Sequence, residues 1–86
     1  MTSFQHTVTD PAGLHARPAG VLIKTLQGYE SDITLTAKGK TVSAKKLFAV
    51  MGLAVKCGDT ITLAAAGPDA EAAITAAQAT LAAEGI

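Results

Sequence analysis

Apolar and polar residues alternate along three stretches of the chain, a spacing that predicts half-buried strands because successive strand side chains point to opposite faces. These stretches are Phe4–Val8, Ile33–Ala37 and Thr60–Ala64. A fourth strand, Thr41–Ser43, is expected to return as a hairpin after the turn at Lys38-Gly39. The pattern therefore predicts four strands, two of which form a hairpin.

Three other segments carry apolar residues at helical spacing. A first helix is expected over Ala16–Gln27, stopped by Gly28 in the left-handed conformation. A short second helix is expected over Leu47–Ala54, with Gly52 inside it. The last helix is expected to begin with Pro68 in its first turn and to end at Gly85.

The predicted order of elements is strand, helix, strand, strand, helix, strand, helix (βαββαβα). A four-stranded antiparallel sheet with the three helices on one face is the simplest arrangement that buries these amphipathic faces. The threonine-rich opposite face can meet water. The sequence thus predicts an α+β fold, an open-faced two-layer sandwich, with residues 1–86 forming a single domain.

Composition narrows the possible partners. Seven basic residues balance seven acidic ones and aromatic residues are few, which argues against nucleic-acid binding. The longest apolar stretch, Leu47–Leu53, is interrupted by Gly52 and is far shorter than the roughly 20 residues of a membrane helix. A single cysteine, Cys57, and an N-terminus without a secretion-signal pattern predict a cytoplasmic protein.

The charges are unevenly distributed along the chain. All seven basic residues lie between Arg17 and Lys56, whereas the chain from Cys57 onward carries four acids and no base. One part of the surface is therefore expected to be positive and to attract acidic partners or phosphate.

The segment Gly13–Ala19 carries the most informative chemistry. His15 is expected at or just before the start of the first helix, because Pro18 is tolerated only in a first turn. Unpaired amides and the helix dipole favour a negative charge there, and Arg17 offers a fork of donors suited to phosphate oxygens. Since a histidine ring is largely neutral and nucleophilic near pH 7, these parts together predict a transient phosphohistidine.

The segment Gly13–Ala19 resembles the active-site signature of HPr, the histidine-containing phosphocarrier family of the phosphoenolpyruvate-dependent sugar phosphotransferase system. Residues 31–33, 39–42 and 84–85 are also similar, so the resemblance covers essentially the whole chain. It implies that His15 takes a phosphoryl group on Nδ1 from phosphorylated enzyme I and passes it to the EIIA unit of a sugar permease. Arg17 would stabilise that group, with Ala16 as a further phosphate-binding residue.

The resemblance also implies a docking surface for enzyme I and EIIA. Leu47, Phe48 and Met51 match an exposed apolar patch on the second helix, and Gly20 and Lys24 match its continuation along the first. Three large apolar residues on so short a helix exceed what a core would take. The alternative is that Leu47 and Met51 are core residues. A monomer without cofactor or metal, and without independent enzymatic turnover, is expected.

One position departs from the family pattern. Many Gram-positive HPr proteins carry a regulatory serine at the start of the second helix, where this chain has Lys46. Lysine has no hydroxyl group to phosphorylate, and its charge opposes the positive helix end. Control by a serine kinase is therefore not expected.

Two rival functions stay open. A small phosphate-handling hydrolase would need a base near Arg17, and the sequence offers no acid within six residues of it. A nitrogen-regulatory relative of HPr is the closer competitor. His6 is expected to be a hydrogen-bonded structural residue and Cys57 a partly buried thiol, and neither has the spacing of a metal-ligand pair.

Overall fold

The computed structural model describes residues 2–86, and this part of the chain contains four strands and three helices. The strands are β1 (Thr2–Thr7), β2 (Asp32–Ala37), β3 (Lys40–Ser43) and β4 (Thr60–Ala66), and the helices are α1 (Ala16–Gln27), α2 (Leu47–Met51) and α3 (Ala70–Ala83). The elements follow one another in the predicted order.

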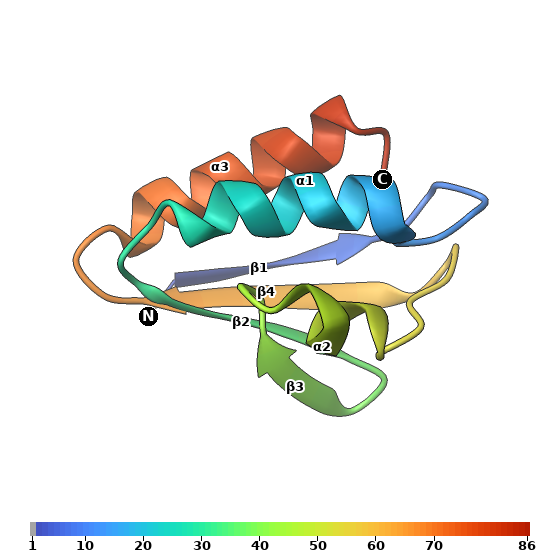
Figure 1. Ribbon diagram of the computed structural model, residues 1–86, viewed down its shortest axis with the longest axis horizontal. Coiled ribbons are helices and arrows are strands. Elements are labelled where there is room, and N and C mark those ends of the chain that lie inside the picture. The colour runs from blue at the N-terminus through green and yellow to red at the C-terminus, as the bar shows by residue number, and fades with distance from the viewer. Residues whose placement is uncertain (1) are drawn as a thin grey trace.

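The four strands form one antiparallel sheet in the order β1-β4-β2-β3. The last strand in sequence, β4, therefore lies between β1 and β2. Figure 1 shows α1 and α3 running side by side over one face of the sheet, with the short α2 close to β3. This arrangement confirms the predicted α+β open-faced sandwich.

The core lies between the sheet and the two long helices. Every second residue of β2 and β4 is buried, and these strand residues face buried residues of α1 and α3. The helix α3 contributes small side chains, including the buried Ala73 and Ala77, which allow it to pack closely. The largest side chains in the core are leucine and isoleucine, among them Leu22, Leu26, Leu35, Ile61, Leu63 and Leu81. Their burial supplies most of the hydrophobic stabilisation, at about 25 cal/mol per Å² removed from water.

The ends of α1 and α2 differ from the predictions. Gly28 is right-handed, with φ −77°, rather than left-handed, and α1 closes with a hydrogen bond from its N–H to the carbonyl oxygen of Thr25, three residues earlier, at 3.3 Å. The helix α2 ends at Met51, so Gly52 follows the helix instead of lying inside it. Ala54 was expected in the helix but lies beyond its end, in a left-handed conformation with φ 52°.

The start of α3 also differs, because Pro68 lies before the helix and Asp69 is its N-cap. The Asp69 carboxylate accepts hydrogen bonds from the N–H groups of Glu30 and Ser31, each at 2.9 Å, and from the Ser31 hydroxyl group. These bonds, the Ser31 hydroxyl first among them, lower the pKa of Asp69. Asp69 thereby joins the loop after α1 to the loop before α3, at the end of α1 remote from His15.

Candidate functional site

His15 is the N-cap residue of α1, as the sequence predicts. Its backbone is extended, with φ −92° and ψ 175°, and its carbonyl oxygen accepts the N–H of Ala19 at 3.0 Å. The imidazole makes no capping hydrogen bond to the helix, and the side chain is 45 % exposed. The ring is therefore held at a helix start but is free to meet another molecule.

The first turn of α1 leaves backbone donors beside the imidazole. Within residues 2–86, the amides of Ala16 and Arg17 donate no hydrogen bond, and Pro18 has no N–H to donate. A helix start with free amides also carries the positive end of the helix dipole. Ala16 and Arg17 can thus bind phosphate oxygens through their backbones.

A glycine fixes the approach of the chain to His15. Gly13 has φ 72°, and a Cβ atom there would lie 2.4 Å from the carbonyl oxygen of Val55. The next residue, Leu14, is buried and donates its N–H to the same oxygen at 3.1 Å. Only glycine fits this close approach, which pins the loop before His15 against the segment before β4.

An acidic residue that the sequence did not single out contacts His15. The Asp10 Oδ2 atom lies 3.5 Å from His15 Nε2, while Oδ1 accepts the N–H of Ala12 at 2.8 Å. Asp10 is followed by Pro11, and this turn chemistry folds the carboxylate back toward the histidine. This contact was not predicted from the sequence.

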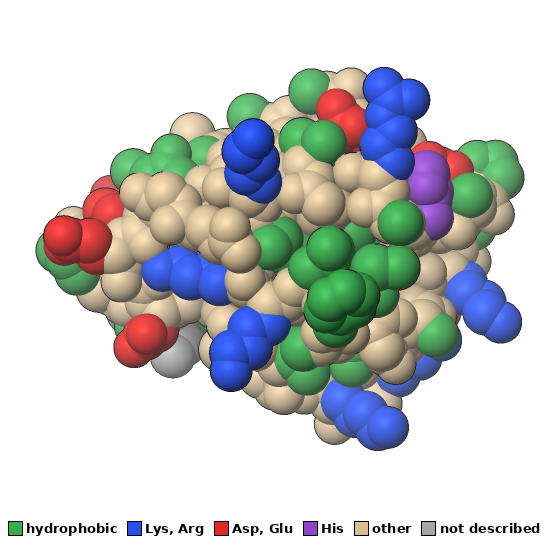
Figure 2. Space-filling model, viewed as in Figure 1, with side chains coloured by type: hydrophobic (Ala, Val, Ile, Leu, Met, Phe, Trp, Pro, Cys, Tyr) green, Lys and Arg blue, Asp and Glu red, His purple; other side chains and the backbone are tan. Residues whose placement is uncertain are grey.

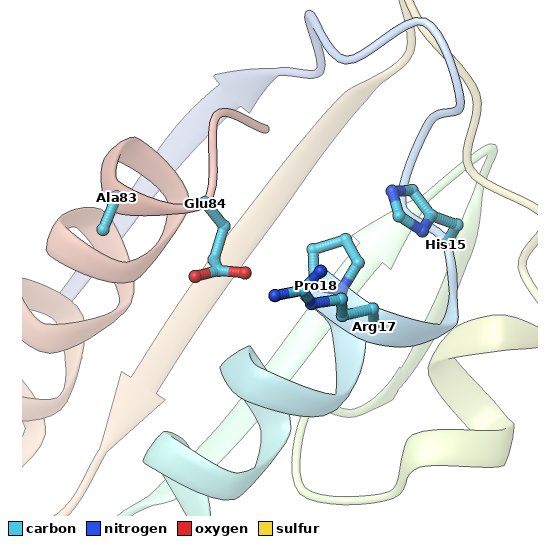
Figure 3. A pocket seen from close by; sticks show the side chains of 5 residues that line it. All are labelled: His15, Arg17, Pro18, Ala83 and Glu84. Carbon is cyan, nitrogen blue, oxygen red and sulfur yellow. The ribbon is translucent and has the colours of Figure 1, made fainter.

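His15 and Arg17 border a cavity of about 280 Å³, together with Pro18, Ala83 and Glu84. Figure 3 shows the Glu84 side chain, which follows α3, pointing toward the Arg17 guanidinium group. The fold brings Glu84 to this cavity because α3 runs alongside α1 (Figure 1). The sequence could show the similarity of residues 84–85 to the family but not this position in space.

The apolar patch of α2 lies on the same face as the histidine. Phe48 is 85 % exposed and Met51 37 % exposed, so neither side chain is a core residue. Leu47 is half-buried and packs against the core, so it only partly fits the expected patch. Val21 of α1, 39 % exposed, is a further large apolar residue that the sequence did not single out. Figure 2 shows hydrophobic side chains gathered beside the histidine on this face.

Two predicted docking residues lie on α1. Gly20 is half-buried and Lys24 is exposed, and both share a helix face with Arg17 because they follow it by three and seven residues, respectively. A Cβ atom at Gly20 would meet no other atom within 4 Å. The fold itself does not require a glycine at this position. The absence of a side chain at Gly20 leaves a shallow depression in the surface of the helix.

Charge on this face agrees with the predicted asymmetry. Figure 2 shows Lys and Arg side chains spread around the apolar side chains, while acidic side chains gather at the end away from the histidine and also lie beside the histidine itself. Lys46 is the N-cap residue of α2 and makes no capping bond through its side chain. The nearest preceding hydroxyl group, that of Ser43, accepts the N–H of Lys45 at 3.3 Å.

Two predictions about isolated residues are wrong. His6 was expected to be hydrogen-bonded, but its Nε2 atom is buried without a partner in the described part of the chain, because its strand turns that edge of the ring inward. Cys57 is exposed rather than partly buried, since it lies in the turn before β4.

Residues 2–86 contain no group of three or more His, Cys, Asp or Glu side chains that could hold a metal ion. Over the same residues, no helix combines the length and the apolar character that crossing a membrane demands.

The comparisons with known proteins agree on one family. Residues 2–83 match the family model described as the PTS HPr component phosphorylation site. The phosphocarrier protein HPr of Mycoplasma capricolum is 43 % identical over 81 residues, which are 94 % of this chain and 91 % of that protein. A solved Mycoplasma histidine-containing phosphocarrier protein superposes with a TM-score of 0.96 at 40 % identity, covering 98 % of this chain and 96 % of the other. An HPr from Thermoanaerobacter tengcongensis, solved as a dimer, has a TM-score of 0.78 at 32 % identity, covering 98 % and 97 %.

The fold and these likenesses place the protein among phosphocarriers built on an open-faced sandwich. Within that class, the chain belongs to the HPr family of the phosphotransferase system.

Proposed function

We propose that His15 accepts a phosphoryl group on Nδ1 from phosphorylated enzyme I and passes it to the EIIA unit of a sugar permease. One observation carries the proposal. The half-exposed imidazole of His15 stands at a helix start without capping it, next to the free amides of Ala16 and Arg17. Nucleophile and anion-binding donors thus lie within one helical turn.

The reaction follows from these parts. The Nδ1 lone pair of the neutral ring attacks phosphorus, and the bond between phosphorus and the donor breaks. The phosphoryl oxygens would then meet the amides of Ala16 and Arg17, which are already in place at the helix start, and the Arg17 guanidinium group, which borders the same cavity. Because the cavity is open, the same group can leave to a second protein by the reverse displacement.

Partner docking is assigned to the surface around the histidine. Phe48 and Met51 offer exposed apolar area, and the half-buried Leu47 packs against the core beside them in sequence. Gly20 and Lys24 extend the surface along α1. We further propose that the protein works as a monomer, with residues 1–86 as one domain, in the cytoplasm, without cofactor or independent turnover.

A phosphate-releasing hydrolase is the second candidate, and one observation favours it. The structure supplies two carboxylates near His15 and Arg17 where the sequence predicted none: Glu84 lines the cavity, and Asp10 lies beside the His15 ring. Either could orient a water molecule. A hydrolase would release inorganic phosphate with repeated turnover, whereas a carrier would accumulate as an acid-labile phosphoprotein.

The test is incubation with enzyme I and radiolabelled phosphoenolpyruvate. We expect one phosphoryl group per chain, lost in acid, absent in His15→Ala and present in the control His6→Gln. Label that persists in His15→Ala would overturn the assignment. Subsequent transfer to a panel of EIIA proteins of the sugar and nitrogen-regulatory branches would separate these two functions.

A further inference from the structure

Both backbone polar groups of Asp10 are hydrogen-bonded. Its N–H donates to the carbonyl oxygen of Ile86 at 3.3 Å, and its own carbonyl oxygen accepts the N–H of Gly13 at 2.8 Å. Its Oδ1 atom accepts the N–H of Ala12 at 2.8 Å, which closes a turn within the loop. The position of the second carboxylate oxygen is therefore dictated by the loop.

That second oxygen, Oδ2, lies 3.5 Å from Nε2 of His15, and the Asp10 side chain is only 22 % exposed. The turn uses Oδ1 alone, so Oδ2 is not needed to hold the loop. The carboxylate meets the ring at Nε2, which leaves Nδ1 as the ring nitrogen without this neighbour. Glu84, the carboxylate that lines the cavity, points toward Arg17 instead (Figure 3).

We propose that Asp10 is a positioning residue for phosphoryl transfer: its carboxylate accepts the Nε2 proton of His15 and so keeps the Nδ1 lone pair free for attack. This inference rests on the function proposed above. The contact is long for a hydrogen bond, as such contacts often are before the reacting complex forms. A carboxylate that holds an imidazole in one tautomer through its second nitrogen is a recurrent device in catalysis.

The proton balance of the step explains why the carboxylate helps. The ring attacks with its proton on Nε2, the Nδ1–phosphorus bond forms and the donor's bond to phosphorus breaks. The ring then carries one positive charge, with its proton still on Nε2, and no proton has to move. The negative Asp10 carboxylate faces that charge and stabilises the transition state that creates it. In the reverse step the ring leaves as the same neutral tautomer.

Two substitutions separate this role from the turn. In Asp10→Asn the amide oxygen can still accept the Ala12 N–H, but an NH₂ group then faces Nε2 and favours a proton on Nδ1. In Asp10→Ser the hydroxyl group can keep the turn and the contact with the ring is lost. Asp32→Asn, at an exposed carboxylate at the start of β2, is the matched control.

The first measurement is the tautomer of the free protein, read from ¹⁵N chemical shifts in long-range ¹H–¹⁵N correlation spectra at about pH 9, where an ordinary histidine is neutral. We expect the Nε2–H form to dominate in the wild type and in Asp32→Asn, and its population to fall in Asp10→Asn. Equal populations in wild type and Asp10→Asn would overturn the inference. Because this readout needs no phosphoryl donor, it tests Asp10 separately from the proposed function.

The second measurement is the rate of phosphorylation by enzyme I. Since the His15 side chain is half exposed, solvent weakens its interaction with Asp10, and we expect a loss of about two- to fivefold in Asp10→Asn and Asp10→Ser, with unchanged thermal melts. Rates equal to that of Asp32→Asn would refute the role of Asp10 while leaving His15 as the phosphorylation site. A wild type that takes no label would instead refute the proposed function.

Discussion

The Glu84 carboxylate faces the Arg17 guanidinium group across the cavity that also contains His15 (Figure 3). These residues lie at opposite ends of the sequence and meet because α3 packs beside α1. Arg17 therefore has a negative neighbour before any phosphoryl group arrives. An incoming phosphoryl group must displace or tolerate this carboxylate.

Replacing Glu84 by glutamine should speed phosphorylation of His15. The substitution removes the charge that repels the phosphoryl dianion and leaves Arg17 free to bind it. We expect a gain of about twofold at low salt, shrinking at high salt because exposed charges are screened. The control is Glu71→Gln, in the first turn of α3 and at the opposite end of that helix. A slower Glu84→Gln protein would show that the carboxylate assists the reaction.

Arg17→Ala should impair transfer far more than folding. Removing one preorganised donor to developing charge costs up to about 4 kcal/mol where water is excluded, and this open cavity should give less. We expect phosphorylation to slow by about ten- to a hundredfold while Tm stays within a few degrees. Stopped-flow or quench measurements beside Lys40→Ala, an exposed cation at the start of β3, would check this. Equal rates in both variants would contradict the role of Arg17.

Phe48→Glu should weaken docking and spare the fold. The side chain is 85 % exposed, so a charge there disturbs little of the core, but a partner that desolvates the ring would lose a central contact. We expect the KM for enzyme I to rise about tenfold, with a nearly unchanged circular-dichroism melt. Gln5→Glu, exposed on β1, controls for the added charge. Unfolding of Phe48→Glu would mean that the ring supports the core.

The fold was largely predictable because its determinants are local. Alternation places every second residue of β2 and β4 in the core, and this pattern is written in the sequence itself. The helix ends were less predictable, since Pro68 is excluded from α3 by the bonds that Asp69 makes with the distant Ser31. The insertion of β4 between β1 and β2 is a long-range pairing that no local pattern encodes.

The candidate site also combines residues that a local sequence pattern predicts with residues that only tertiary packing brings together. His15 and Arg17 share one short segment, so helix-start chemistry was enough to single them out as candidates, whereas Ala16 came from the family resemblance. Glu84 reaches the cavity only through the packing of α3 on α1, and Asp10 reaches the ring through the geometry of a turn. Whether the buried Nε2 atom of His6 has a hydrogen-bond partner likewise depends on the residues that pack over β1, and the alternation of apolar and polar residues does not predict these contacts.

Asp69→Asn should reduce stability at neutral pH and flatten its dependence on acid. The folded pKa of Asp69 lies below the ordinary value of 3.8, mainly because the Ser31 hydroxyl binds the ionised form. Its stabilisation is therefore complete above the ordinary pKa and disappears as the pH falls through the lower folded pKa. We expect Tm to fall by a few degrees at pH 7 and the difference from wild type to narrow below about pH 4. A constant difference across this range would contradict the linkage.

Lys46 should exempt the protein from control by a serine kinase. A phosphoserine at the N-cap of α2 would place nearly two negative charges where amides and the helix dipole favour them, and so create an acidic docking surface. Lys46 has the opposite charge and no hydroxyl group. The nearest preceding hydroxyl, that of Ser43, lies at the end of β3 and accepts the N–H of Lys45, so it belongs to the strand end rather than to the helix start.

The test of this prediction is incubation with ATP and the bifunctional HPr kinase of a Gram-positive bacterium. We expect no phosphoserine in the wild type and partial phosphorylation of Lys46→Ser, because a hydroxyl group then occupies the N-cap of α2. Lys46→Ala, which removes the charge without adding a hydroxyl group, is the matched control and should stay unmodified. Stoichiometric phosphorylation of the wild type at Ser43 would contradict the prediction, since regulation would then act from the end of β3 instead of the start of α2.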